Sequence, residues 1–197
     1  MKMPPFLADG YVLRRGAVPA AWLDDLRAAF DAGVKPSDEW PAPRGVHWRH
    51  SQLDLDPSIQ KVCRLPEVLA VAGGVIGERF FLAQVEGREP LHGGGMQRPH
   101  RDLATRLVPG SHRPAPGEPP FDFMDESRSV QISGEAGDIL VFDADLVHAA
   151  SRNADGTRRR SILGSYQAES WYPAHLATAA LRGIRMAISD RFAPDGT

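Results

Sequence analysis

The chain has a single cysteine and no long apolar run among its 197 residues. One cysteine cannot form an internal disulfide, so the fold cannot depend on oxidation. Cys63 stands in the run Val62-Cys63-Arg64-Leu65, which predicts a buried structural thiol rather than a nucleophile. No apolar stretch approaches the ~20 residues of a membrane-spanning helix, and no basic-then-apolar signal segment opens the chain. We therefore expect a soluble, cytoplasmic protein.

A marked excess of charge of either sign is also missing. The formal net charge is −2 at pH 7 and the pI is about 6.4, so nothing favours nucleic acid or an anionic membrane as a partner. The length suffices for one domain with a substantial core, and we expect a single domain over residues 1–197. Three lysines stand against twenty arginines, which is typical of GC-rich codon usage.

The apolar pattern changes along the chain from helical spacing to alternation. Helices are expected at 19–32, at 58–76 with breaks near Pro66 and at Gly73-Gly74, and at 173–186. Strands are expected at 6–16, 79–86, 97–102, 105–109, 129–133, 138–142 and 158–167. Helices first and short strands after predict a mainly β fold with helical cover, a double-stranded β-helix or jelly roll like that of the cupins.

Two histidines and a carboxylate stand at positions that suit a metal ion. Side chains two apart on a strand share a face, so His100 and Asp102 can bind one metal while Arg101 points away. His148 would complete the site from elsewhere in the fold. Two histidines and one carboxylate on one face are the ligand set of mononuclear non-haem iron(II) oxygenases. A lone His-x-Asp pair also occurs by chance, so the prediction depends on the segment around His148.

That segment has the expected order of parts. It begins at the turn Gly137-Asp138, continues as an apolar strand and reaches His148. Arg159 follows eleven residues later, and its planar guanidinium can bind a carboxylate through two parallel hydrogen bonds. Ser161 shares the face of Arg159 on an alternating strand and is a second candidate for cosubstrate binding. The arginines on either side of Arg159 would point the other way, into solvent.

With these motifs, the chain resembles the phytanoyl-CoA dioxygenase family of iron(II)/2-oxoglutarate-dependent oxygenases. The resemblance covers most of the chain. It is carried by Asp9-Gly10-Tyr11-Val12-Leu13, by Val85-Glu86-Gly87-Arg88-Glu89-Pro90, by Thr105-Arg106-Leu107-Val108-Pro109-Gly110-Ser111-His112, and by the block from Gly137 to Arg159. It implies iron(II) ligation by His100, Asp102 and His148, a contact of Arg159 with the distal carboxylate of 2-oxoglutarate, and further cosubstrate contacts from Gln97 and Thr105.

One departure from the family pattern lies beside the motif. The family has roughly thirty to forty residues between the His-x-Asp pair and the Thr-Arg-Leu-Val-Pro-Gly-Ser-His strand, whereas only Leu103 and Ala104 lie between Asp102 and Thr105 here. Two residues suffice for a tight turn but not for a pair of strands at ~5–6 residues each. We therefore expect that a segment is absent relative to the family, either through a real deletion or because the sequence joins two segments across a missing stretch.

The resemblance implies a dioxygenase that consumes 2-oxoglutarate and dioxygen and oxidises a C–H bond of a small molecule, most simply by hydroxylation. Desaturation, ring closure and epimerisation use the same ligands. Two alternatives stay open. The short connection favours a catalytically inactive or metal-free jelly-roll binding protein, and two histidines with a carboxylate also suit a zinc hydrolase, which would leave Arg159 without a role. The sequence specifies neither the substrate nor the oligomeric state, although the GC-rich codon usage favours bacterial natural-product biosynthesis as the setting.

A further group of aromatic side chains is left without a role by this reasoning. Trp40, His47, Trp48 and His50 lie in a region, residues 35–57, that is expected to be a loop near the mouth of the site. They could pack as a lid or contact substrate, and the sequence favours neither.

Overall fold

A computed structural model describes residues 4–96, 106–113, 117 and 127–195 of the chain. Its α-helices are α1 (Pro4–Asp9), α2 (Leu23–Ala32), α3 (Pro57–Val62), α4 (Pro66–Ile76) and α5 (Tyr172–Thr178). Single turns of 3-10 helix are η1 (Ala20–Trp22), η2 (Ser37–Glu39), η3 (Glu169–Trp171) and η4 (Ala180–Arg182). Within the described ranges no helix is long and apolar enough to cross a membrane.

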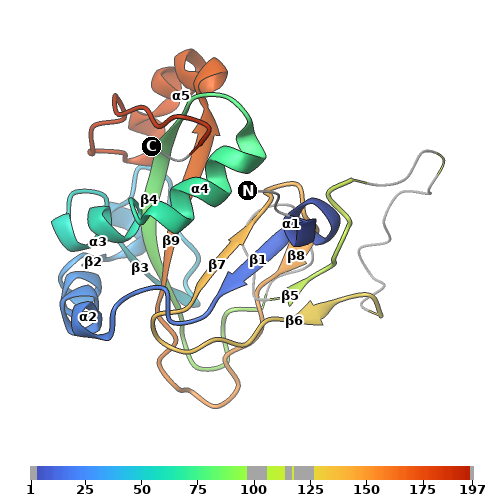
Figure 1. The fold of residues 1–197 in the computed structure, drawn as a ribbon. Helices are drawn as coiled ribbons and strands as arrows, with labels where there is room; N and C mark the ends of the chain where they lie inside the picture. Colours follow the sequence, from blue (N-terminus) through green and yellow to red (C-terminus); the bar gives the residue numbers. More distant parts are fainter. Residues whose placement is uncertain (1–3, 97–105, 114–116, 118–126, 196–197) are drawn as a thin grey trace.

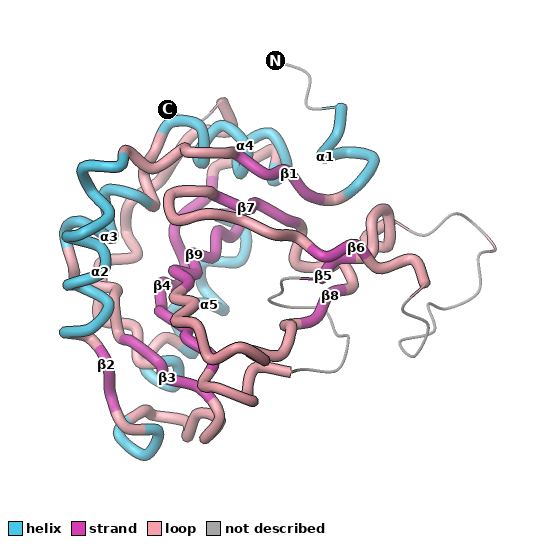
Figure 2. The backbone as a smooth tube through the Cα atoms, turned by 90° about the horizontal axis from the view of Figure 1, so that it is seen from below, coloured by secondary structure: helices cyan, strands magenta, loops and turns pink. Residues whose placement is uncertain are grey.

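The described strands pair into antiparallel sheets with the orders β1-β7, β2-β3-β4-β9 and β6-β5-β8. Their bounds are β1 (Tyr11–Arg14), β2 (Val34–Lys35), β3 (Trp48–Ser51), β4 (Phe80–Pro90), β5 (Arg106–Leu107), β6 (Val130–Gln131), β7 (Ile139–Phe142), β8 (His148–Ala149) and β9 (Ser161–Ala168). The long strands β4 and β9 lie between helices α2 and α3 on one side and the short strands β5 and β8 on the other (Figures 1 and 2). The arrangement is the expected one of strand layers with helices outside.

The two faces of β4 have different surroundings. Val85 lies in the main apolar cluster with Phe30 of α2, whose side chain is buried. Gly87 leaves room for the Phe30 ring, since a Cβ there would lie 2.6 Å from a ring carbon. Side chains alternate along a strand, so Glu86 and Arg88 point to the opposite face, away from Phe30 of α2. The strands β5 and β8 lie on the side of β4 that is away from α2 (Figure 2).

The first segment differs from the expected strand over residues 6–16. Residues 4–9 form α1, and the helix ends at Gly10, whose amide donates to the Phe6 carbonyl at 2.9 Å. Gly10 has a φ of +81°, the left-handed conformation that glycine adopts without a steric penalty. The strand therefore begins only at Tyr11, where β1 pairs with β7.

The break expected at Pro66 is confirmed, but the break at Gly73-Gly74 is wrong. Pro66 is the first residue of α4, where its missing N–H costs no hydrogen bond. The helix continues through both glycines to Ile76 and ends before Gly77, which has a φ of +73°. Gly73 is required by packing rather than by a break, because any Cβ there would overlap the carbonyl of Pro194.

The loop expected over residues 35–57 and the helix expected over residues 173–186 are also partly wrong. The first contains β3, which pairs along its whole length with the end of β4, and β4 itself continues four residues beyond the expected bound at 86. The second is the short helix α5 followed by η4, which ends at Gly183 with a φ of +68°. The first error comes from pairing between segments distant in the sequence, and the second from the left-handed conformation of Gly183.

Cys63 provides a test of this packing. Its side chain is buried in the main apolar cluster, and burial raises the pKa of the thiol to about 12. Because the thiolate is the reactive form, we expect a disulfide reagent such as dithionitrobenzoate to react with the folded protein at pH 8 at least ~100-fold more slowly than with the guanidinium-unfolded chain. Equal rates in the two states would show that the cluster around Cys63 is open to solvent.

Candidate metal and cosubstrate site

The residues expected in the site divide into two groups. Gln97, His100, Asp102 and Thr105 lie outside the described residues, as does the strand expected at 97–102. The short connection between Asp102 and Thr105 lies there as well, so the structure does not test the expected missing segment. His148, Arg159 and Ser161 lie within the described part of the chain.

His148 is held in one orientation from two sides. It is the first residue of β8, it is 1% exposed, and its backbone lies opposite Leu107 of β5. Its Nδ1 lies 2.5 Å from the carbonyl oxygen of Leu146, and since a carbonyl only accepts, Nδ1 carries the proton. The Phe142 ring packs edge-on against the imidazole at a centroid distance of 5.1 Å. The lone pair of the ring is therefore on Nε2.

This arrangement is the one that metal-binding histidines have. Such a histidine binds the metal through one nitrogen and donates the other N–H to a carbonyl or carboxylate, which fixes the tautomer and the ring plane. A buried histidine with Nδ1 committed to Leu146 fits an iron(II) ligand that binds through Nε2. Among the described residues no group of three His, Cys, Asp or Glu side chains is close enough to bind a metal, and the other two expected ligands are not among them.

The turn before β8 places His148 in this position. Asp143 closes the turn, because its carboxylate accepts from the Asp145 amide at 2.9 Å and its carbonyl accepts from the Leu146 amide at 2.9 Å. The Ser111 hydroxyl accepts a hydrogen bond from the Val147 amide at 2.8 Å, which attaches the turn to the segment that follows β5. The contacts of Asp143 are therefore those of a turn residue.

Arg159 points away from its two neighbours, as the expected alternation requires. Its guanidinium donates to the Ser151 carbonyl at 2.6 Å. Because Ser151 lies three residues after His148, this bond brings the guanidinium within roughly 15 Å of the His148 backbone. Arg158 and Arg160 both bind Asp31 of α2 on the other face, at 2.7 and 3.0 Å. The side chain of Arg159 thus lies on the face of the sheet that is turned away from α2.

Arg158 and Arg160 were expected to point into solvent, but they form an ion-pair cluster instead. Arg158 also binds Glu89 of β4 at 2.7 Å, and Arg49 of β3 binds the same carboxylate at 3.0 Å. The hydrogen bond from Arg158 is the main cause that lowers the pKa of Glu89 below its ordinary value of 4.5. The cluster fixes the start of β9 to β4 and α2, and so positions Arg159.

Ser161 lies in a row that crosses the sheet. Its backbone is opposite Arg88 of β4, which in turn is opposite His50 of β3. Residues opposite each other on paired strands share a face. His50, Arg88 and Ser161 therefore lie on the same face as Arg159. Sequence reasoning missed Arg88, although the alternation Gln84-Glu86-Arg88 was a usable signal once β4 was continued past residue 86.

The Gly137-Asp138 turn that precedes β7 also makes the contacts that a strand start needs. Asp138 accepts hydrogen bonds from the Glu135 amide at 2.9 Å and the Gly16 amide at 2.8 Å, and pairs with Arg15 at 2.6 Å. These bonds favour the carboxylate and lower the pKa of Asp138 from 3.8 to about 2.

A pH-dependent part of the stability follows from Asp138. Because the pKa is lower in the folded chain, the contribution is complete above about pH 4 and is lost as the pH falls toward about 2. We expect Asp138→Asn to lower the melting temperature at pH 7, and to show a smaller further decrease between pH 4 and pH 2 than the unchanged chain. Melting curves followed by circular dichroism measure both. Parallel pH dependences of the two proteins would contradict the assignment.

We compared the chain with known protein families and with curated proteins. The family model for phytanoyl-CoA dioxygenase (PhyH) matches residues 104–161, and over this stretch it confirms the family resemblance expected from the sequence. No curated protein matches the chain significantly.

Solved structures with the same fold are numerous. The epimerase SnoN of nogalamycin biosynthesis matches with a TM-score of 0.65 at 19% identity, covering 84% of this chain and 81% of its own. HygX from Streptomyces hygroscopicus matches with a TM-score of 0.67 at 11% identity, covering 86% and 88%. EctD from S. alaskensis matches with a TM-score of 0.63 at 16% identity, covering 85% and 75%. At these identities the likeness establishes the fold, and the expected double-stranded β-helix is confirmed.

Proposed function

We propose that this chain, a double-stranded β-helix with a phytanoyl-CoA dioxygenase segment, is an iron(II)/2-oxoglutarate-dependent dioxygenase that oxidises a C–H bond of a small molecule. The observation that carries the proposal is His148: a buried histidine with Nδ1 fixed by a carbonyl, within the matched segment and near an arginine on the interior face. Hydroxylation is the reaction that we assign, and desaturation, ring closure and epimerisation are alternative outcomes that use the same ligands.

The ligand set of the proposal is His148 with His100 and Asp102. Iron(II) bound by these three would supply the centre at which 2-oxoglutarate and dioxygen react, and imidazole and carboxylate donors suit that ion. The protein would fix the positions of these donor atoms and exclude water from their surroundings. Leu107, opposite His148, is 0% exposed, and with Phe142 it forms an apolar wall that excludes water beside the imidazole.

Arg159 is assigned to the distal carboxylate of 2-oxoglutarate. Its bond to Ser151 uses one Nη2 hydrogen, and a guanidinium has five N–H donors in all, so donors remain for a carboxylate. The ion pairs of Arg158 and Arg160 hold the backbone on both sides, so little conformational freedom is lost when the cosubstrate binds. Ser161, exposed on the same face, is a further donor in the proposal, together with Gln97 and Thr105.

The ligands of similar structures support a small-molecule substrate. SnoN was solved with Fe3+, alpha ketoglutarate and nogalamycin RO, and HygX with nickel, 2-oxoglutarate and hygromycin B. Natural-product biosynthesis is therefore the setting we propose for this chain. The proposal includes one domain over residues 1–197, and a cytoplasmic location in keeping with the single buried cysteine.

The turnover of 2-oxoglutarate tests the proposal. With Fe(II), ascorbate and air, we expect the protein to form succinate from 2-oxoglutarate slowly without substrate, and faster when a small-molecule library contains one. Protein loaded with Zn2+ is the control and should form none. Succinate formation at the rate of the zinc control would favour the inactive jelly-roll alternative, and hydrolysis of library esters by the zinc form would favour the hydrolase.

A further inference from the structure

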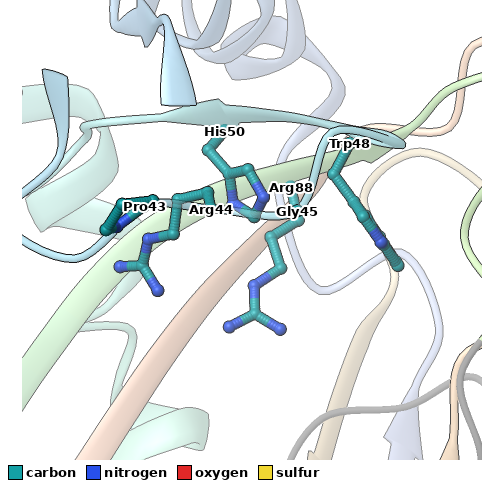
Figure 3. A pocket seen from close by; sticks show the side chains of 6 residues that line it. All are labelled: Pro43, Arg44, Gly45, Trp48, His50 and Arg88. Carbon is teal, nitrogen blue, oxygen red and sulfur yellow. The ribbon is translucent and has the colours of Figure 1, made fainter. Parts of the chain in front are cut away.

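A cavity of about 240 Å³ lies beside the row that joins His50 to Ser161. Its walls are the loop before β3, β3 itself and the end of β4, through the residues Pro43, Arg44, Gly45, Trp48, His50 and Arg88. Figure 3 shows the side chains of Arg44, His50 and Arg88 gathered in this cavity, with Trp48 at its side. The metal and cosubstrate roles proposed above use none of these residues.

The charge of the cavity is positive. Arg44 and Arg88 both bind the buried carboxylate of Glu86, at 2.8 Å from Arg44 and 2.7 Å from the Nε of Arg88. Among the described residues of the cavity, one carboxylate against two guanidinium groups leaves one positive charge without a compensating carboxylate. The two arginine side chains are only 23% and 19% exposed, so this charge is poorly screened by water.

Several donors in the cavity have no partner among the described residues. The Nε of Arg44 and both ring nitrogens of His50 are buried without a hydrogen bond, as is the indole nitrogen of Trp40 beside them. His50 is 7% exposed, and its ring packs against Trp40 and Trp48 at centroid distances of 6.1 and 6.4 Å. Buried polar groups without partners are costly and rare in native proteins, so such a cluster indicates a site that a ligand completes.

His50 contributes to this site as a neutral group. Burial is the main cause that lowers its pKa to about 4, with Arg88 and Arg44 lowering it and Glu86 opposing them. At neutral pH the imidazole therefore offers one donor and one acceptor and adds no charge. The positive charge of the cavity comes from the arginines alone.

We propose that this cavity, lined by Arg44, His50, Trp48 and Arg88, binds the anionic group of the substrate, a carboxylate or a phosphate ester. The planar guanidinium groups match the oxygen geometry of both anions, and the indole of Trp48 provides an apolar surface for the carbon skeleton beside the anion. The assignment of the ligand as substrate rests on the proposed function, because Arg88 shares the interior face with Ser161 and Arg159.

Calorimetric titration of the metal-free full chain with simple anions tests the site without iron or 2-oxoglutarate. Benzoate and phenyl phosphate are the probes, and benzamide is the uncharged control. We expect saturable binding of at least one probe, with at least ~10-fold weaker binding of benzamide. The stronger probe identifies the anion as carboxylate or phosphate. Addition of 2-oxoglutarate should leave the probe affinity unchanged, whereas competition between them would identify the cavity as the cosubstrate site and overturn the proposal.

Two substitutions with opposite expected signs locate the binding. Arg44→Gln should weaken the probe at least ~10-fold, and Glu86→Gln should strengthen it several-fold by removing the compensating charge. A gain in affinity cannot result from unfolding, so Glu86→Gln keeps the test valid if Arg44→Gln is unstable. Arg79→Gln, which removes an exposed arginine at the opposite end of β4, is the matched control and should stay within twofold.

The outcomes separate this inference from the proposed function. Probe binding that follows Arg44 and Glu86 supports the anion site even if the protein never turns over 2-oxoglutarate. Turnover of 2-oxoglutarate by a protein that binds neither probe would retain the oxygenase and reject the anion site. Equal weakening by Arg44→Gln and Arg79→Gln would show a nonspecific charge effect and would also reject it.

Discussion

A His148→Ala variant is expected to lose stoichiometric iron(II) binding and all 2-oxoglutarate turnover. Structural metal sites are worth ~10–16 kcal/mol, so one ligand of three or four accounts for roughly 3–4 kcal/mol, or about 10²–10³ in metal affinity. Alanine also removes the imidazole whose orientation the Leu146 carbonyl fixes. Among the described residues no group of three His, Cys, Asp or Glu side chains could hold the metal instead. Equilibrium dialysis with Fe(II) under argon, together with succinate formation, measures both losses.

His92→Ala is the matched control for this prediction. His92 is exposed in the loop after β4, and its ring forms a hydrogen bond with the Ala154 carbonyl at 3.2 Å, so the variant should bind iron as the unchanged chain does. A His148→Ala protein that melts normally and still binds one equivalent of iron would reject the proposed ligand set. The melting curve is needed because His148 is fully buried and its truncation leaves a cavity.

An Arg159→Ala variant is expected to bind iron normally but to require far more 2-oxoglutarate. Hydrogen bonds to charged groups are worth ~1.5–3 kcal/mol each, so loss of a two-bond contact with a carboxylate should raise the KM for 2-oxoglutarate by at least about 100-fold. Arg159→Lys should recover part of the loss, since lysine keeps the charge but not the planar fork. Steady-state succinate formation against 2-oxoglutarate concentration gives these values.

Arg158→Ala provides the control, one residue away on the opposite face. It breaks the ion pairs with Asp31 and Glu89, so we expect a lower melting temperature and an almost unchanged KM for 2-oxoglutarate. If Arg158→Ala raised the KM as much as Arg159→Ala, the effect would reflect the stability of the start of β9. Arg159 would then have no cosubstrate role of its own.

Local patterns carried most of what could be predicted from the sequence. The alternation around Arg159 determines which arginine faces the interior, because side-chain direction on a strand depends only on position. The Gly137-Asp138 turn and the break at Pro66 are likewise properties of a few adjacent residues. The resemblance to the family over residues 104–161 and the jelly-roll class, which was expected from the order of helices and strands, were both confirmed.

Features that depend on distant contacts were not predictable in this way. β3 becomes a strand because β4 offers it a partner forty residues later in the chain, and β4 extends because β3 and β9 pair with both its edges. The row His50, Arg88 and Ser161 exists only in that register. The proposed anion site could therefore not be predicted from the sequence, which left His50 open between packing in a lid and contacting substrate.

The measurement that tests the central claim most directly is an anaerobic titration of the metal-free protein with Fe(II) and then 2-oxoglutarate, followed by visible absorption. We expect a metal-to-ligand charge-transfer band that saturates at one equivalent of each, and that is absent in His148→Ala. No band in well-folded protein would contradict the oxygenase assignment. The chain would then be a jelly-roll binding protein that has lost the metal site.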